Sequence, residues 1–366
     1  MKKALAILLT MVLTLGLGLT ALAENVNAEI AMITDIGTID DKSFNQGTWE
    51  GLKAYAEANG KTSNYYKPVE QSTNAYLDQI DQAVSKGAKV IVTPGYLFEE
   101  PIFIAQDKYP DVHFILIDGN PHNADYSEYR TEKNTVGIVF AEEQAGYLAG
   151  YAAVKDGNTK LGFMGGMAVP AVIRYGYGFV QGAEAAAKEL GVAEVALNYY
   201  YTGNFAATPE NQAMAASWYS AGTEVIFACG GAVGSSVMAA AKASGTGKVI
   251  GVDVDQSSQS DTVITSAMKG LASAVEQALT AYYADKFPAG EAWVLGADKD
   301  GVGLPMATSK FQKFTQADYD ALFAKLVAGE VTLVKDVKAE KDADGKQIPN
   351  TLADLGTTIV KVTEVK

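Results

Sequence analysis

Apolar residues in this chain fall into short uninterrupted runs that alternate with longer segments in which they recur every three or four positions. The first run, residues 30–34, is bounded by turn residues and is typical of a strand buried on both faces. The next segment has helical spacing at Phe44, Trp49 and Leu52, and Ser43 stands where an N-cap is expected. Alternation of this kind predicts parallel sheets covered by helices.

The same alternation continues along the chain. It predicts strands at residues 63–67, 89–95, 112–118, 135–140, 161–166, 195–200, 224–228, 248–252, 264–269 and 293–296. It predicts helices at residues 74–86, 101–108, 142–155, 171–190, 209–221, 233–243, 271–286 and 318–328. Residues 122–134 are polar and without a period, so they are expected to form a surface loop.

A break at residues 156–158, after which the pattern starts again, predicts two lobes in series. We expect an α/β protein with two doubly wound parallel-sheet lobes joined by a hinge of several strands. The first lobe is expected to span residues 29–155 and the second 156–268. Residues 271–295 are expected to return to the first lobe, and part of 296–366 to join the second.

The first residues are of a different kind. Residues 1–3 carry two lysines, residues 4–19 are apolar, and residues 21–23 are small, which is the order found in secretory signal peptides. We expect cleavage after Ala23, with Ala28 as the alternative, and an exported protein of the periplasm or cell surface. A membrane anchor is the competing interpretation, but the apolar run is short for a span.

Charge and cysteine content narrow the possible partners. The formal net charge is −14 over 366 residues, which argues against nucleic acid and anionic membrane surfaces as partners. Cys229 is the only cysteine. An intrachain disulfide and a thiol-based metal site are therefore excluded, and no cysteine stands at the cleavage site to carry a lipid.

Carboxylates follow several predicted strands. Asp35, Asp118 and Asp253 each come after an apolar run, and ligands of open α/β sheets bind outside the carboxyl ends of the strands. Phe44 and Phe205 are aromatic residues of loops or first helical turns in opposite lobes. For Asp35 and Phe44, a turn-capping aspartate and a core phenylalanine remain open as the alternative.

Other strand ends carry residues that a ligand can approach. Lys269 follows the strand expected to connect the lobes, and Gly230 and Gly231 follow another, where a tight turn is the alternative explanation. Carboxylates combined with two aromatic side chains suit a ligand with a sugar part and a flat base. The arginines near these positions are few, Arg130 and Arg174, which favours a neutral solute.

Motifs for catalysis are absent from the sequence. The two histidines, His113 and His122, have neither metal-ligand spacing nor the context of a nucleophilic triad. No Gly-x-Ser-x-Gly elbow and no phosphate-binding loop occurs, and the acidic pairs 40–41 and 142–143 are interpreted as solvated faces. We therefore expect no catalytic residue, no cofactor and no bound metal.

Four stretches of sequence resemble the motifs of a known family. They are residues 34–46 (TDIGTIDDKSFNQ), 140–150 (FAEEQAGYLAG), 162–166 with 178–179 (GFMGG and GF), and 250–256 with 266–269 (IGVDVDQ and SAMK). On these motifs the chain resembles the basic membrane protein (BMP) family of ABC-transporter substrate-binding proteins, which includes purine nucleoside receptors of the PnrA type. The resemblance implies the bilobed periplasmic-binding-protein fold of type I.

The resemblance also implies a role for each candidate residue. Asp35 matches the aspartate that hydrogen-bonds the purine, and Phe44 and Phe205 match the aromatic residues that enclose the base. The loop after Phe205 reads Ala206-Ala-Thr-Pro209, without the family's usual Asp-Pro pattern. Asp253 and Lys269 match the residues that bind the ribose hydroxyl groups, with Asp255 as an alternative to Asp253. Gly230 or Gly231 matches a backbone contact to the ligand, and Asp118 matches a further contact.

We therefore expect the extracytoplasmic receptor of an ABC importer, a monomer that captures a nucleoside, with a purine favoured, between its lobes. Its expected partners are the nucleoside and the permease subunits in the membrane, with no nucleic acid. Three alternatives stay open. They are a binding protein for a sugar or another small solute, a ligand sensor for a membrane signalling partner, and an enzyme that hydrolyses nucleosides.

Overall fold

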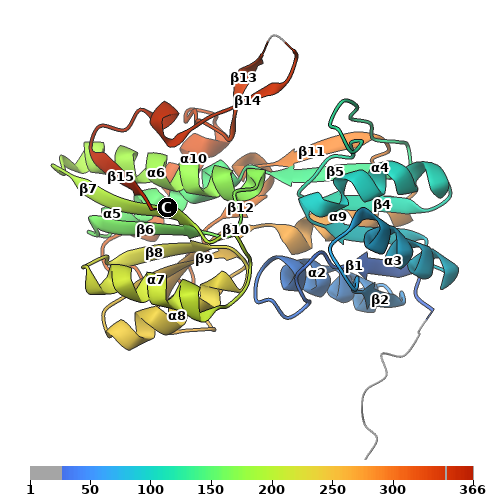
Figure 1. Ribbon diagram of the computed structural model, residues 1–366, viewed down its shortest axis with the longest axis horizontal. Coiled ribbons are helices and arrows are strands. Elements are labelled where there is room, and N and C mark those ends of the chain that lie inside the picture. Colours follow the sequence, from blue (N-terminus) through green and yellow to red (C-terminus); the bar gives the residue numbers. More distant parts are fainter. Residues whose placement is uncertain (1–26, 343, 366) are drawn as a thin grey trace, which may run out of the picture.

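The computed structural model describes residues 27–342 and 344–365. In this part of the chain the helices and strands form two α/β lobes, each built on one large sheet (Figure 1). The predicted signal peptide, residues 1–23, lies outside the described residues. Among the helices that are described, none combines the length and the apolar character needed to cross a membrane.

The sheet of the first lobe consists of parallel strands. Its members are β1 (Ile30–Ile33), β2 (Ser63–Tyr66), β3 (Val90–Pro94), β4 (His113–Ile117), β5 (Thr135–Phe140) and β11 (Glu291–Leu295). They lie in the order β11-β5-β4-β3-β1-β2. Helices α2 (Phe44–Ala58) and α9 (Leu271–Tyr283) cover one face, and η1 (Tyr96–Phe98), α3 (Thr73–Ser85) and α4 (Glu99–Lys108) cover the other. All four residues of β1 are therefore buried, which confirms the strand predicted there.

The second lobe repeats this arrangement with a larger sheet. Its strands are β6 (Lys160–Gly165), β7 (Val195–Tyr201), β8 (Val225–Cys229), β9 (Lys248–Asp253), β10 (Val263–Lys269), β12 (Val302–Gly303) and β15 (Val360–Glu364). They lie in the order β12-β10-β9-β8-β6-β7-β15, and only the pair β10 and β12 is antiparallel. Helices α5 (Glu142–Lys155) and α6 (Pro170–Leu190) cover one face, and α7 (Pro209–Ser220) and α8 (Val233–Ser244) the other.

Helix α5 packs in the second lobe, whereas the sequence analysis placed residues up to 155 in the first. Glycines on both α5 and α6 allow the two helices to approach closely. A Cβ on Gly150 would lie 2.0 Å from the carbonyl oxygen of Phe179, and one on Gly178 would lie 2.0 Å from that of Glu143. The chain therefore crosses between the lobes directly after β5, and it crosses again after β10 and after β11.

The last part of the chain adds short elements to the second lobe. They are η2 (Ala297–Lys299), α10 (Gln316–Val327), β13 (Val337–Lys341), β14 (Gln347–Pro349) and η3 (Leu352–Leu355). Strands β13 and β14 form a hairpin that stands above the second lobe in Figure 1. The segment before it is fixed to α6, because the Gln181 side chain donates to Val334 O at 2.9 Å and accepts from Val334 N at 2.8 Å.

Candidate functional site

A cavity of about 1230 Å³ lies where the carboxyl ends of strands from both sheets face each other. Eight residues that the sequence analysis singled out line it: Asp35, Phe44, Asp118, Phe205, Gly230, Gly231, Asp253 and Lys269. Asp35 and Asp118 follow strands of the first lobe, and Asp253 and Lys269 end strands of the second. The structure thus brings residues that are more than 200 positions apart in the sequence to one site.

Asp35 is held at the end of β1 by its own loop. Its Oδ1 accepts hydrogen bonds from Gly37 N at 2.7 Å and from Asn45 Nδ2 at 2.9 Å. Desolvation by the surrounding protein raises the pKa of Asp35 to about 6, although these two hydrogen bonds oppose the shift. Gly95, with φ of 117°, passes so close that a Cβ would lie 2.9 Å from Asp35 Oδ2. A side chain at position 95 would displace the carboxylate.

Phe44 is the first residue of α2, and the cap of this helix differs from the prediction. Asp41, interpreted from the sequence as part of a solvated pair, accepts from the backbone N–H groups of Ser43, Asn45 and Gln46 at 2.9 to 3.1 Å. The Ser43 hydroxyl, predicted to cap the helix, instead donates to Asp253 Oδ2 across the cleft at 2.5 Å. Ser43 therefore links the first lobe to the second.

Phe205 reaches the cavity from the loop after β7. Its ring lies over Gly166, where a Cβ would come within 2.5 Å of the ring atoms. The backbone of Ala232 donates to Phe205 O at 3.1 Å, which ties the loop to the start of α8 beside Gly231. Phe44 and Phe205 thus present flat apolar surfaces to one cavity from opposite lobes.

The Lys269 ammonium group is the centre of a buried charge cluster. It pairs with Asp118 of the first lobe, and it lies 3.2 Å from Glu142 Oε1 and 3.9 Å from Asp253 Oδ1. It also lies 4.9 Å from the centroid of the Phe44 ring. The lysine side chain is 2% exposed, so one cation is surrounded by three carboxylates with little access to water.

Burial and charge act on these groups in opposite directions. Burial raises the pKa of Asp118 to about 6 even though Lys269 opposes the shift, and it also raises the pKa of Asp253. Burial would lower the pKa of Lys269, but Asp118, Glu142 and Asp253 together hold it above its ordinary value. The site therefore places the positive charge of Lys269 next to two carboxyl groups, Asp118 and Asp253, whose pKa values are raised by burial.

Glu142 is a site residue that the sequence analysis missed, because it interpreted the pair 142–143 as a solvated face. The structure buries Glu142 completely, and its Oε2 accepts from Arg174 Nε at 2.6 Å. Burial would raise the pKa of Glu142, but Arg174 and Lys269 hold it below its ordinary value. Its position two residues after the end of β5 follows the same strand-end rule as Asp118, and that was the available signal.

The structure separates the two candidates of the Asp-x-Asp motif. Asp253 is 7% exposed and lines the cavity. Asp255 is outside the cavity lining and accepts from Thr308 Oγ1 at 2.7 Å and from Ser257 N at 3.0 Å. Both Asp118 and Asp253 have left-handed backbones, with φ of 62° and 66°, a conformation that costs energy in residues other than glycine and that concentrates at functional sites.

Several buried acceptor atoms in the site have no hydrogen-bond donor among the described residues. They are Asn45 Oδ1, Asp118 Oδ1 and Asn120 Oδ1, together with Glu142 Oε1, which faces the Lys269 ammonium group. Buried acceptors without donors are unfavourable, so a ligand that brings hydroxyl or amino groups would be stabilised here. In the described part of the chain, no group of three or more His, Cys, Asp or Glu side chains is arranged to hold a metal ion.

Two doubly wound lobes with polar and aromatic side chains on their facing strand ends define a solute-binding protein of the bilobed periplasmic-binding type. The family described as "ABC transporter substrate-binding protein PnrA-like" matches residues 28–335, and the chain belongs to this family. The resemblance seen in the four sequence motifs is therefore confirmed.

Individual proteins agree with this assignment. The ABC transporter nucleoside-binding protein BmpA of Lactococcus lactis subsp. cremoris is 30% identical over 304 residues, which cover 77% of this chain and 83% of that protein. The CD4+ T-cell-stimulating antigen of Listeria monocytogenes is 29% identical, over 90% of this chain and 98% of that protein. A crystal structure of an ABC solute-binding protein from Aeropyrum pernix, at 22% identity, has the same fold with a TM-score of 0.73 over 86% of this chain and 94% of its own.

Proposed function

We propose that this protein is the extracytoplasmic receptor of an ABC importer and that it captures a purine nucleoside in the cleft between its lobes. The observation that carries the proposal is that aromatic rings and carboxylates from both lobes line one cavity. The name of the related Lactococcus protein, a nucleoside-binding protein, supports the same ligand class. Rings and buried acceptors together suit a molecule with a flat base and a hydroxylated sugar.

In this proposal the base lies between Phe44 and Phe205. Asp35 accepts a hydrogen bond from an amino or ring N–H group of the base, because its carboxylate is fixed by Gly37 and Asn45. The unpaired Oδ1 of Asn45 is a second acceptor on the same side of the site. Stacking contributes about 0.5–1.5 kcal/mol per ring beyond area burial.

The ribose hydroxyl groups are assigned to the charge cluster. Asp253 accepts from one hydroxyl, Lys269 donates to another, and the free Oδ1 of Asp118 accepts a third hydrogen bond. The backbone of Gly230 or Gly231 supplies a further contact where β8 ends. Hydrogen bonds to charged groups contribute roughly 1.5–3 kcal/mol each, so a dissociation constant in the micromolar range or below is expected.

The proposal includes no bond-making step and no cofactor. The lobes close on the ligand, and the closed form docks on the permease subunits of the importer. Export follows from the predicted signal peptide, and the protein acts as a monomer. A nucleoside hydrolase would need a general base with access to water, whereas the carboxylates here pair with Lys269, Ser43 or Asn45.

Isothermal titration calorimetry with inosine, guanosine, adenosine, cytidine, hypoxanthine and ribose tests the proposal. We expect binding of purine nucleosides, weaker binding of the free base and little binding of ribose. Incubation with inosine should release no free base. If no nucleoside binds to protein that has been stripped of ligand by unfolding and refolding, the proposal is wrong, and tight ribose binding would favour a sugar receptor instead.

A further inference from the structure

The cavity extends past the proposed nucleoside site along a wall of tyrosines. Its volume of about 1230 Å³ exceeds the roughly 300–1,000 Å³ that is usual for small-molecule sites. The lining beyond Asp35 includes Tyr96, Tyr126 and Tyr129. Tyr126 and Tyr129 are 63% and 62% exposed, which is unusual for large rings that border a cleft.

These tyrosines continue directly from the proposed base site. Gly95 packs against the Asp35 carboxylate, and Tyr96 is the next residue. Tyr96 lines the cavity together with Asp35 and Tyr126. Burial raises the pKa of Tyr96, and the neighbouring Asp35, Tyr126 and Glu99 raise it further. A group attached to the base at the edge that faces Asp35 would therefore extend toward the tyrosine wall.

The rings of Tyr126 and Tyr129 pack against His122, whose side chain is 4% exposed. The Tyr126 ring stacks on the His122 ring with centroids 4.1 Å apart, and the Tyr129 ring lies 5.2 Å away. His122 is itself held between Glu99 Oε2 at 3.2 Å and Asn123 O at 2.7 Å. Tyr126 has a left-handed backbone, with φ of 59°, which a bulky residue adopts only where its surroundings enforce it.

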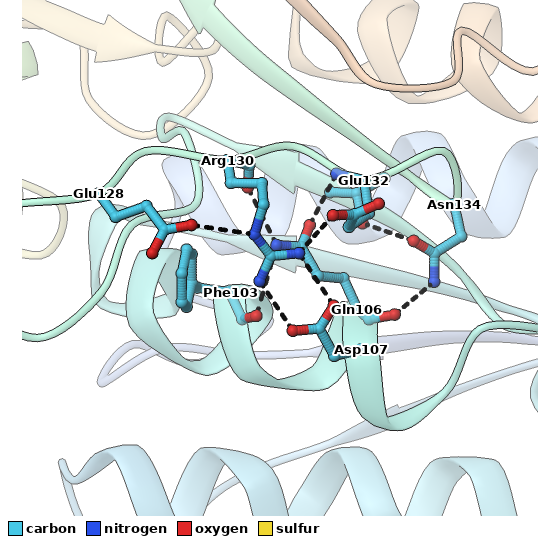
Figure 2. Close-up of polar contacts among 8 residues, drawn as sticks. Phe103, Gln106, Asp107, Glu128, Arg130, Glu132 and Asn134 are labelled. Atoms are coloured by element: carbon cyan, nitrogen blue, oxygen red, sulfur yellow. Dashed lines mark hydrogen bonds and ion pairs between the residues drawn. The ribbon is translucent and has the colours of Figure 1, made fainter.

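The loop that carries these rings is anchored at its base to α4, as Figure 2 shows. Arg130 forms two hydrogen bonds with Asp107, at 2.9 and 2.7 Å, and its guanidinium lies 4.7 Å from the Phe103 ring. The Gln106 side chain donates to Arg130 O at 2.9 Å and accepts from Glu132 N at 3.0 Å. The exposed rings are therefore preorganised, so a ligand that stacks on them loses little additional conformational entropy.

We propose that Tyr96, Tyr126 and Tyr129 form an outer subsite that takes a flat, uncharged ring attached to the exocyclic amine of a purine nucleoside. The inference rests on the proposed nucleoside function and narrows its substrate class to base-substituted nucleosides. A singly substituted amine keeps one N–H group for Asp35, while its substituent stacks on the tyrosines. Glu99 and Asp125 border the same wall, so an anionic substituent is disfavoured.

Calorimetry with adenosine, N6-benzyladenosine and N6-(4-carboxybenzyl)adenosine tests the subsite. We expect the benzyl compound to bind about fivefold to tenfold tighter than adenosine, and the carboxylated compound to lose this advantage. In the double variant Tyr126→Ala/Tyr129→Ala, the two uncharged ligands should bind equally, with the dissociation constant for adenosine unchanged within twofold. The matched control is Tyr65→Ala, because Tyr65 is a half-exposed tyrosine outside the cavity lining.

The arms of this experiment separate the two proposals. If adenosine binds but the benzyl compound binds no tighter, or if its advantage persists in the double variant, the subsite is wrong and the nucleoside function stands. If adenosine does not bind to the wild-type protein at all, the proposed function is wrong and the subsite falls with it.

Discussion

Glu142 Oε1 lies 3.2 Å from the Lys269 ammonium group, on a carboxylate whose other oxygen accepts from Arg174 Nε at 2.6 Å. Glu142 therefore holds Lys269 from the second lobe while Asp118 pairs with the same ammonium from the first. Arg174 also reaches Asp336, at 3.4 Å, just before the β13–β14 hairpin. The position of the buried Lys269 side chain in the cleft thus depends on groups from several elements.

Glu142→Gln should weaken nucleoside binding by about tenfold and lower the free energy of unfolding by about 1–3 kcal/mol, because Lys269 and Arg174 lose a buried charged acceptor. Calorimetry and urea denaturation measure the two effects. Glu143→Gln is the matched control, since Glu143 pairs with Lys335, a side chain that is 54% exposed. Equal binding by the Glu142 variant and the wild type would contradict the positioning role.

Phe44→Ala should weaken nucleoside binding by roughly tenfold, because the base loses one of its two stacking surfaces. Phe44→Tyr should retain most of the affinity, and binding of free ribose should not change. Calorimetry with one nucleoside and with ribose measures the difference. If Phe44→Ala affects ribose and the nucleoside equally, the ring acts on packing of α2 and does not stack on the base.

The site could be predicted from the sequence largely because its residues stand at strand ends. Apolar runs located the ends of β1, β4 and β9, so Asp35, Asp118 and Asp253 were found without knowledge of the sheet order. Glu142 obeys the same rule after β5, but the following Glu143 made the pair look like a solvated face. Local sequence does not show that Arg174, 32 positions away, neutralises the first of the two.

Other features depend on contacts that no local pattern reports. Strand β15 pairs with β7 through the register Val360 to Val195, 165 positions apart, and most of its residues are polar or exposed. The packing of α5 against α6 depends on backbone contacts at glycines, which hydrophobic periodicity does not register. Tyr126 and Tyr129 of the tyrosine wall were not predicted either, because residues 122–134 have the composition of an ordinary surface loop.

The pKa of Asp35 makes the stability of the ligand-free protein depend on pH. The folded protein holds the proton of Asp35 up to about pH 6, whereas the unfolded chain releases it near pH 4, so ionisation disfavours folding as the pH rises through this range. The stability of the wild type relative to Asp35→Asn should therefore fall between about pH 4 and pH 6 and then level off. Urea denaturation at several pH values measures it.

Asp255→Asn is a control of opposite sign for this experiment. Burial would raise the pKa of Asp255, but hydrogen bonds from Thr308 and Ser257 hold it below its ordinary value. Its contribution to stability is therefore present above about pH 4 and is lost as the pH falls. The difference in unfolding free energy between the wild type and Asp35→Asn could instead be independent of pH, or could rise with pH as expected for Asp255. Either result would show that Asp35 is not desolvated.

Glu184 anchors the C-terminal strand, and its loss should destabilise the second lobe. Its carboxylate accepts from the backbone N–H groups of Thr358, Ile359 and Val360 at 2.8 to 3.0 Å. Burial opposes ionisation, but these bonds lower the pKa of Glu184 to about 2. The stabilisation is thus complete above about pH 4.5 and is lost as the pH falls toward 2. By urea denaturation, Glu184→Gln should lower the free energy of unfolding by about 1–3 kcal/mol at pH 7 and by almost nothing at pH 2.

Glu189→Gln is the control, because Glu189 forms a half-exposed ion pair with Lys155. This substitution should change the free energy of unfolding by less than about 1 kcal/mol. Equal effects of the two variants would contradict the anchoring role.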